Sequence, residues 1–341
     1  MKAIIYTEFG PPEVLHLAER PQPVPKDSEV LVRVHATPVA YGDLLARNFK
    51  DVTSREFNMP LPLLFPMRLV FGLRKPKVTI LGSEFAGEVE AVGSAVTRFK
   101  SGDQVMGYLG QRMGAYAEVV CIAESGSLAL KPANMSYAEA AAVPYGAIMA
   151  MSLLRRAHIQ PGQKVLINGA SGGIGSAAVQ LAKHHGAEVT GVCGAPRLEY
   201  VSSLGADHVI DYATEDFTQN GETYDLIFDV LGKSSFAQCK GSLKPNGIYL
   251  LASFKTKALT QMMWTKLAGS LPGRQTGQKV ICAMAAENAE SLIFVKELVE
   301  AGKFKTLIDR CFPMDQAAEA HRYAESGHKQ GAVVIAIDPV R

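Results

Sequence analysis

Lys164-Val-Leu-Ile-Asn-Gly-Ala-Ser-Gly-Gly-Ile-Gly175 is the stretch of sequence on which the predicted fold depends. Its first residues form a short apolar run of the kind that makes a buried strand, and its glycines predict a tight turn. Residues 176–185 then carry apolar side chains at helical spacing, Gly186 ends that helix, and residues 188–193 indicate a second strand. A strand, a glycine turn, a helix and a second strand in this order are typical of the dinucleotide-binding βαβ unit.

The glycines of this turn have separate physical reasons. Gly172 lets the backbone approach a pyrophosphate, and Gly175 lets the helix pack closely on the strand. The start of the helix presents free N–H groups and the positive end of its dipole to the phosphates. Ala170 occupies the place of the usual first glycine, so the glycine pattern alone is incomplete. The strand before the turn and the helix after it favour a dinucleotide-binding unit over the alternative, a glycine-rich turn in an unrelated α/β protein. The predicted phosphate-binding residues are Ser171, Gly172, Gly173, Ile174 and Gly175.

Strand-like and helix-like segments continue to alternate beyond this unit. Residues 208–211, 224–230 and 248–252 are short apolar runs separated by helical patterns and turns, and residues 278–284 follow as a final strand. Such alternation predicts the α/β fold class with a doubly wound parallel sheet. We therefore assign residues 132–287 to a nucleotide-binding domain.

Residues 1–131 have a different pattern. Short runs of alternating or clustered apolar residues lie between glycines and prolines, which is typical of a partly barrel-like, mainly-β domain. Within it, residues 48–78 form an irregular, proline-rich segment with basic and large apolar residues. Long irregular connections are often functional lids, and a partner-binding or merely packed loop is the open alternative.

The composition excludes several classes of protein. A formal net charge of +2 gives no reason to expect a nucleic-acid or membrane partner, and the most apolar segment, residues 59–73, is too short and too interrupted by prolines to span a bilayer. The five cysteines are scattered and form no disulfide framework or metal knuckle. No signal peptide is recognisable at the start, so we expect a cytoplasmic protein.

Four stretches carry a resemblance to a known family. They are residues 36–47, residues 82–93 with Gly82-Ser-Glu-Phe-Ala-Gly87, residues 99–105 with Gly102-Asp103, and residues 168–212. With the order of the segments along the chain, they make this sequence similar to the medium-chain dehydrogenase/reductase superfamily, and specifically to its zinc-independent quinone oxidoreductase-like branch. The resemblance implies a GroES-like catalytic domain built from residues 1–131 and 288–341, with a Rossmann domain between them.

The residues at the family's zinc positions predict that no metal is bound. Zinc enzymes of this superfamily hold the ion with cysteine, histidine and a third cysteine or acid. By comparison with them, the first ligand position is Ala40, the second is Ser83, and the third falls at or near Tyr145. None of these side chains is a normal zinc ligand. We interpret Asp43 and Glu84 as structural residues, each hydrogen-bonded to backbone at a turn.

Without zinc, another group must polarise the substrate or supply the proton. The resemblance points to Tyr41, in the turn that carries the first zinc ligand in the metal enzymes, and to Tyr145 as its counterpart. A phenol can donate to a developing enolate or alkoxide. Either tyrosine could instead pack against a nicotinamide ring. The family often has asparagine at the position of Ala40, so this chain departs from the family's pattern there.

The end of the second strand predicts NADPH as the cofactor. NAD-specific folds place an acid there on the ribose 2′-OH, but residues 192–197 contain none, and the first acid is Glu199. Arg197 offers a forked cation for a 2′-phosphate, and a solvated arginine at a helix start is its alternative. Tyr212 matches the family's adenine-side tyrosine, and Lys329 is a weaker third candidate.

These observations favour an NADPH-dependent, zinc-independent oxidoreductase that transfers a hydride to a quinone or enone. A metal-free carbonyl or alcohol oxidoreductase is one alternative, and an NADPH-binding structural or regulatory protein without turnover is another. We also expect a homodimer, because relatives pair edge strands at the position of residues 278–284.

Overall fold

The structure is a computed structural model that describes residues 1–53, 56, 60–253, 256–268, 277–283, 286 and 288–337. The chain forms two compact units. The terminal unit contains Met1–Val52, Phe65–Tyr145 and Glu287–Arg341, and the central unit contains Thr53–Leu64 and Gly146–Ala286. The principal boundary thus falls between residues 145 and 146, whereas the sequence analysis placed it between 131 and 132. Residues 132–145 join the terminal unit because helix α3 (Tyr137–Ala141) packs on two strands there, β3 and β4.

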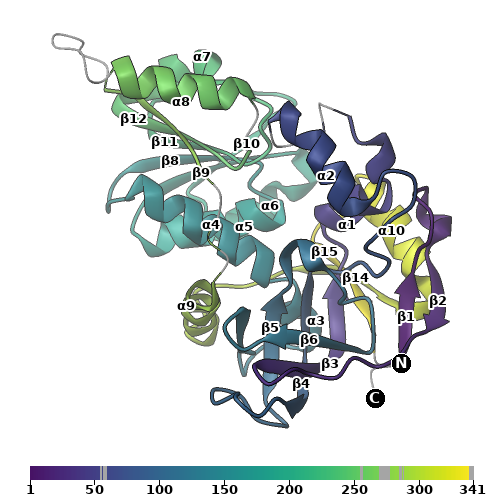
Figure 1. Ribbon diagram of the computed structural model, residues 1–341. Helices are drawn as coiled ribbons and strands as arrows, with labels where there is room; N and C mark the ends of the chain where they lie inside the picture. Colours follow the sequence, from purple (N-terminus) through teal and green to yellow (C-terminus); the bar gives the residue numbers. More distant parts are fainter. Residues whose placement is uncertain are drawn as a thin grey trace. The chain divides into compact units, whose positions relative to one another are not determined.

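The central unit is built on a six-stranded sheet in which every neighbouring pair is parallel (Figure 1). The strand order is β10-β9-β8-β11-β12-β13. From β8 the chain adds β9 and β10 on one side and then crosses over to add β11, β12 and β13 on the other side. This change of side between β8 and β11 is the arrangement of the Rossmann fold. The strands are β8 (Lys164–Asn168), β9 (Glu188–Cys193), β10 (His208–Asp211), β11 (Tyr224–Asp229), β12 (Leu243–Leu251) and β13 (Lys279–Cys282).

Helices cover both faces of this sheet. Helices α4, α5 and α6 lie on one face, and α7 and α8 lie on the other (Figure 1). Because both faces are covered, the central strands are continuously apolar; Val165, Leu166 and Ile167 of β8 are fully buried. The helices are α4 (Pro144–Ala157), α5 (Gly173–His184), α6 (Leu198–Ser203), α7 (Phe236–Cys239) and α8 (Thr256–Ala268).

The terminal unit contains a mainly antiparallel sheet in the order β14-β15-β3-β4-β5-β7, with β6 paired to β3. Strand β15 pairs with β3, so the C-terminal part of the chain completes the N-terminal sheet. The strands are β3 (Glu29–Pro38), β4 (Glu84–Val92), β5 (Gln104–Tyr108), β6 (Val119–Ala123), β7 (Ser127–Leu130), β14 (Ile308–Pro313) and β15 (Ala332–Ala336), with a separate pair β1 (Lys2–Ile5) and β2 (His16–Glu19). The predicted combination of a GroES-like domain and a Rossmann domain is confirmed.

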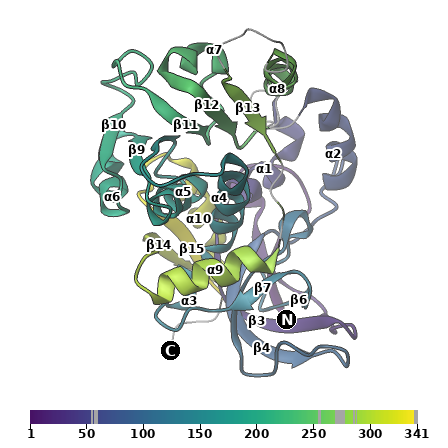
Figure 2. The ribbon, with the colours of Figure 1, turned by 90° about the vertical axis from the view of Figure 1, so that its left-hand side faces the viewer.

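The helices of the terminal unit include two that the sequence analysis did not predict, α1 (Tyr41–Arg47) and α2 (Leu64–Phe71). Helix α2 lies within the proline-rich segment 48–78; its Pro66 falls in the first turn, where a missing N–H breaks no helical bond. Helix α9 (Ala289–Glu300) lies against β7 (Figure 2), and α10 (Ala317–Glu325) precedes β15. Across the described ranges, no helix combines the length and apolar character needed to cross a membrane.

Candidate functional site

The glycine turn lies at the carboxyl end of β8. Gly169 has a φ of +93°, a conformation that favours glycine. The N–H groups of Gly169 and Ala170 both donate to the Val192 carbonyl of β9, each at 3.0 Å. The Ala170 methyl is buried, and it faces Gly191, where an added Cβ would lie 3.1 Å from it. Alanine therefore fits at position 170. The positive φ that favours glycine belongs to the neighbouring residue Gly169, and Gly191 on the facing strand has no side chain to meet the alanine methyl.

The start of α5 combines a tight contact with an open one. An added Cβ at Gly175 would lie 2.0 Å from the Gly169 carbonyl oxygen, so the close helix–strand approach inferred from the sequence is present. Gly172 is the N-cap, and an added Cβ there would meet nothing nearer than 3.7 Å. Gly173 is exposed and has no neighbour within 4 Å of such a Cβ. The first N–H groups of a helix have no intrahelical partner, so this exposed start fits an anionic group such as a pyrophosphate.

Arg197 and Tyr212 lie beside the end of β9. Arg197 closes a short 3-10 turn, and its backbone N–H donates to the Gly194 carbonyl at 2.9 Å. Burial raises the pKa of the Cys193 thiol to about 11, and the nearby Arg197 charge partly opposes that rise. The N–H of Tyr212 donates to the Cys193 carbonyl at 3.1 Å, and this tyrosine is 69% exposed. Both predicted residues thus lie at the same sheet edge as the glycine turn.

The other two residues considered for cofactor binding, Glu199 and Lys329, do not belong to the end of β9. Glu199 is exposed on α6, beyond the short turn that ends at Arg197, so no acid occupies the end of β9 itself. Lys329 belongs to the terminal unit, in the segment between α10 and β15. It is therefore carried by a different unit from the glycine turn.

A buried carboxylate that the sequence analysis missed organises the neighbouring strand end. Asp229 ends β11 and is fully buried. It accepts hydrogen bonds from the side chains of Asn168 at 3.1 Å, Ser234 at 2.7 Å and Tyr249 at 3.0 Å, and from the N–H groups of Gly232 and Ser234, each at 3.0 Å. These bonds hold the loop after β11 beside β8, at the point where the strand order reverses. An acid directly after the apolar run Leu226-Ile-Phe228 was the available signal.

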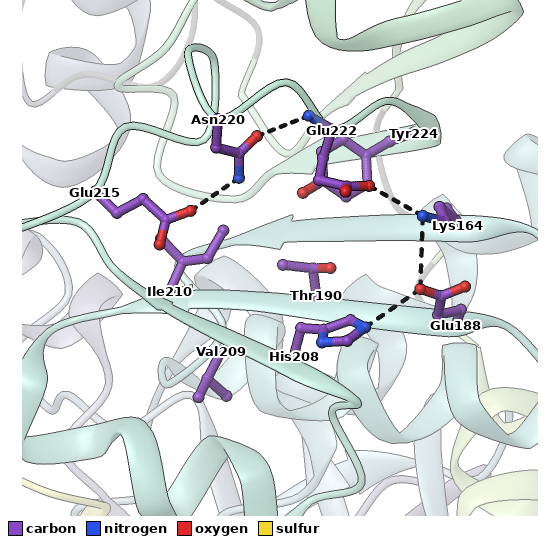
Figure 3. A pocket seen from close by; sticks show the side chains of 10 residues that line it. All are labelled: Lys164, Glu188, Thr190, His208, Val209, Ile210, Glu215, Asn220, Glu222 and Tyr224. Carbon is purple, nitrogen blue, oxygen red and sulfur yellow. Dashed lines mark hydrogen bonds and ion pairs between the residues drawn. The ribbon is translucent and has the colours of Figure 1, made fainter.

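A second feature of the central unit is a cavity of about 290 Å³ at the opposite, amino edge of the sheet (Figure 3). Several of its polar side chains lie close to one another: Lys164 Nζ lies 3.0 Å from Glu222 and 3.8 Å from Glu188, and Glu188 lies 3.3 Å from His208. Ligands of open α/β sheets bind at the carboxyl ends of the strands. The amino-edge cavity is therefore not the nucleotide site.

Two buried carboxylates in the terminal unit bind the backbone at two zinc-equivalent positions, Ala40 and Tyr145, and at Gly82, which precedes the remaining one. Asp43 accepts the N–H groups of Ala40 and Gly82, each at 2.9 Å. Glu84 accepts the N–H of Tyr145 at 2.8 Å. The segment from Gly82 to Glu84 thus joins the start of α1 to the start of α4. The predicted hydrogen bonds of Asp43 and Glu84 to backbone groups are confirmed by these contacts.

Burial makes both carboxyl groups unusually weak acids. Desolvation raises the pKa of Asp43 to about 7, and the hydrogen bonds from Ala40, Gly82 and Tyr116 act in the opposite direction. Desolvation also raises the pKa of Glu84 to about 8; its bond from Tyr145 lowers the pKa, and the Asp43 charge raises it further. Both groups titrate close to neutral pH.

The two candidate tyrosines differ in exposure. Tyr41 is the first residue of α1 and is 52% exposed. Tyr145 is partly buried, and its ring centre lies 5.7 Å from that of Tyr108. The side chains at the zinc-equivalent positions are those of Ala40, Ser83 and Tyr145. Within the described part of the chain, no group of three or more histidine, cysteine, aspartate or glutamate residues is arranged to hold a metal ion.

Comparison with known proteins agrees with this architecture. Two family models match, one described as "Alcohol dehydrogenase GroES-like domain" over residues 26–133 and one described as "Zinc-binding dehydrogenase" over residues 204–335. The chain is 31% identical, over 98% of both proteins, to the "Chloroplast envelope quinone oxidoreductase homolog" of Arabidopsis thaliana. It is also 31% identical to an "NADPH-dependent alkenal/one oxidoreductase, chloroplastic" from the same plant, covering 98% of this chain and 79% of the relative.

A solved structure extends the similarity to three dimensions. The quinone oxidoreductase from Coxiella burnetii is 29% identical, with a TM-score of 0.81 and 99% of each chain covered. The match therefore includes both units, and it accounts for the order of the segments along the chain.

Proposed function

The chain belongs to the medium-chain dehydrogenase/reductase superfamily, among quinone oxidoreductase-like homologues, and from this premise we propose that it is an NADPH-dependent, zinc-independent oxidoreductase. Its substrate is a conjugated small molecule of the quinone or enone type. The observation that carries the proposal is the carboxyl edge of β8 and β9. There an exposed helix start, an acid-free strand end and Arg197 lie together.

The residues of this edge bind the cofactor. Residues Ser171, Gly172, Gly173, Ile174 and Gly175 receive the pyrophosphate at the start of α5. Arg197 pairs with the 2′-phosphate, and Tyr212 supports the adenine side. Lys329, which belongs to the terminal unit and not to this edge, is assigned as a second cation. The nicotinamide, when bound, supplies the hydride. The name of one relative, an NADPH-dependent alkenal/one oxidoreductase, supports both the cofactor and the substrate class.

A tyrosine completes the reaction in this proposal. Hydride addition to a conjugated carbonyl compound leaves negative charge on oxygen, which requires a proton. Tyr41 donates that proton, and its 52% exposure allows solvent to restore it. Tyr145, whose backbone is held by Glu84, orients the substrate. Alanine at position 40 and serine at position 83 leave no ordinary ligand for zinc.

The proposed assembly and location follow the sequence analysis. We assign a homodimer, which strand β13 supports because it forms an edge of the central sheet. The cytoplasmic location stays a prediction, since relatives are named as chloroplastic or mitochondrial. The division of work between a nucleotide-binding central unit and a catalytic terminal unit belongs to the same proposal.

The experiment is to titrate NADPH and NADH against the protein and then follow NADPH oxidation with a panel of quinones, enones and saturated aldehydes. We expect tighter binding of NADPH and turnover of quinones or enones. Turnover of saturated aldehydes alone would support a carbonyl oxidoreductase instead. Tight NADPH binding with no turnover would support a structural or regulatory protein, and equal affinity for the two cofactors would refute the cofactor assignment.

A further inference from the structure

A chain of buried polar side chains crosses the terminal unit. It connects α1 to α10 through Tyr116, which precedes β6. Asp43, Tyr116 and His321 are fully buried, and Arg47 is 3% exposed. Arg47 and His321 are 274 residues apart in the sequence. None of these four residues has a role in the cofactor site or as the proton donor.

Elementary chemistry gives this chain a direction. A guanidinium group only donates hydrogen bonds, and Arg47 Nη1 lies 2.8 Å from His321 Nδ1. The Nδ1 atom must therefore be the acceptor, and a neutral His321 carries its hydrogen on Nε2. That atom lies 3.0 Å from the Tyr116 hydroxyl oxygen, to which it donates. The Tyr116 hydroxyl then keeps its own hydrogen to donate, and a hydrogen bond from Tyr116 is one of the three that lower the pKa of Asp43.

Both ends of the chain are anchored. Arg47 Nη2 donates to Glu325 at 2.5 Å, and its Nε donates to the Gly10 carbonyl at 3.1 Å. At the other end, Asp43 accepts the N–H groups of Ala40 and Gly82. The chain therefore runs from a buried cation to a buried carboxylate, with two neutral rings between them.

We propose that Tyr116 and His321 are positioning residues, which keep the Asp43 carboxylate ionised and thereby hold the turn that begins α1 and carries Tyr41. This inference rests on the proposed function. Deprotonated Asp43 accepts all three hydrogen bonds, whereas the protonated group would lose an acceptor at this turn. The alternative, a chain that only stabilises the fold, has no consequence for the pH dependence of turnover.

Other groups near Asp43 set the background for its titration. Tyr6, Glu84 and Tyr116 interact with its charge, and Arg47 acts on the two rings of the chain. Burial raises the pKa of Asp43 to about 7, and the Tyr116 hydroxyl lowers it. Removing that hydroxyl should therefore raise the pKa again. The same burial, with the Arg47 charge, lowers the pKa of His321 to about 3, so this ring stays neutral through the range in which Asp43 titrates.

The first test compares Tyr116→Phe with the control Tyr323→Phe, which removes a hydroxyl that donates to Asp309 on the same unit. The readout is the pH profile of kcat with NADPH and phenanthrenequinone. We expect Tyr116→Phe to move the acid limb up by about one pH unit, which costs ~10-fold in kcat below that limb. The dissociation constant of NADPH should not change. The control should keep the wild-type profile; an acid limb that does not move in folded Tyr116→Phe would overturn the inference.

The second test does not depend on turnover. In ¹⁵N-histidine spectra, the signal that disappears in His321→Gln identifies His321, and we expect the neutral tautomer with hydrogen on Nε2. A hydrogen on Nδ1 would overturn the chain even if the enzyme is active. Glutamine can accept from Arg47 and donate to Tyr116, so His321→Gln should keep most of kcat, whereas His321→Leu should lose it. If the wild type reduces no substrate, the proposed function fails, while the spectrum still decides the direction of the chain.

Discussion

Gly173 and Gly175 lie two positions apart in α5, yet the structure places different demands on them. An added Cβ at Gly175 would lie 2.0 Å from the Gly169 carbonyl oxygen, whereas one at Gly173 would have no neighbour within 4 Å. At the scale of single residues, the decisive quantity is the space beside the backbone. The same reasoning explains why the methyl group of Ala170 is accommodated opposite Gly191.

We predict that Gly175→Ala lowers the free energy of unfolding by at least ~1 kcal/mol, because the new methyl forces α5 away from β8. Urea unfolding measures the change. Gly173→Ala is the matched control and should alter the free energy of unfolding by less than about 0.5 kcal/mol. Equal effects of the two substitutions would contradict the packing argument.

Arg197 gives a second prediction at this scale. If its guanidinium binds the 2′-phosphate, Arg197→Ala should weaken NADPH binding by about 1.5–3 kcal/mol, the range for a hydrogen bond to a charged group. NADH lacks this phosphate, so its affinity should stay nearly unchanged. Fluorescence titration of both cofactors measures the difference, with exposed Arg156→Ala as the control for loss of a positive charge. An equal loss of affinity for NADPH and NADH would mean that Arg197 does not bind the 2′-phosphate.

At the scale of elements, single buried carboxylates join segments that are distant in the sequence. Asp229 holds the loop after β11 beside β8, and Glu84 holds the start of α4 to the start of β4. Each acts where strands or helices end, because backbone N–H groups lack regular partners there. Their positions therefore depend on which elements meet in the fold.

Glu84 makes stability depend on pH. Its pKa is raised to about 8 in the folded state, so the folded protein binds a proton that the unfolded chain has released, and stability falls as pH rises between about 4.5 and 8. In Glu84→Gln, which keeps an oxygen acceptor for Tyr145, this part of the dependence should vanish.

Urea unfolding at about pH 5.5 and about pH 8.5 tests this prediction. The loss of stability between the two pH values should be smaller in Glu84→Gln than in the wild type by at least ~1.4 kcal/mol, the equivalent of one pKa unit. Asp43 titrates in the same direction in both proteins, so the difference between them reports on Glu84 and its coupling to the Asp43 charge. Identical pH dependence would mean that Glu84 keeps an ordinary pKa.

At the scale of the whole molecule, the terminal unit contains segments from both ends of the chain. In the central unit, β13 is the last strand on one side of the described sheet. In the described ranges, β13 pairs with β12 along one side. The predicted strand 278–284 extends to residue 284, which lies outside the described residues. An open strand edge favours pairing with another chain.

We therefore predict a homodimer in solution. Light scattering at micromolar concentration should give twice the chain mass of 36.6 kDa. A C₂ dimer would place the same edge on both subunits, so the two β13 strands would meet at the two-fold axis. A mass of one chain at that concentration would refute the prediction.

Metal dependence is the other property of the whole molecule that can be tested. With Ala40, Ser83 and Tyr145 at the zinc-equivalent positions, incubation with EDTA or phenanthroline should leave turnover and the unfolding temperature unchanged. Elemental analysis should find no stoichiometric zinc. A metal bound in a one-to-one ratio would overturn the assignment to the zinc-independent branch.

The sequence by itself determined the βαβ unit, the glycine turn and the alternation of the central domain. These signals are local, because helical and strand periodicities and the conformations open to glycine depend on near neighbours. The capping box of α3 is a further case. Ser136 and Glu139 are three residues apart, the spacing of a capping box; the Glu139 carboxylate accepts the Ser136 N–H, and the Ser136 hydroxyl accepts the Glu139 N–H.

Only the tertiary structure decided which distant residues meet. Gly82 donates to Asp43 from 39 positions away, and His321 reaches Arg47 across 274. The sequence contains eight histidines, and nothing in it indicates which of them makes such a contact. A buried polar group needs a hydrogen-bond partner, but positions along the sequence do not identify that partner. Helix α1 was missed for a related reason: its short length gives little periodicity, and Asp43 in its first turn also accepts a hydrogen bond from the distant Gly82.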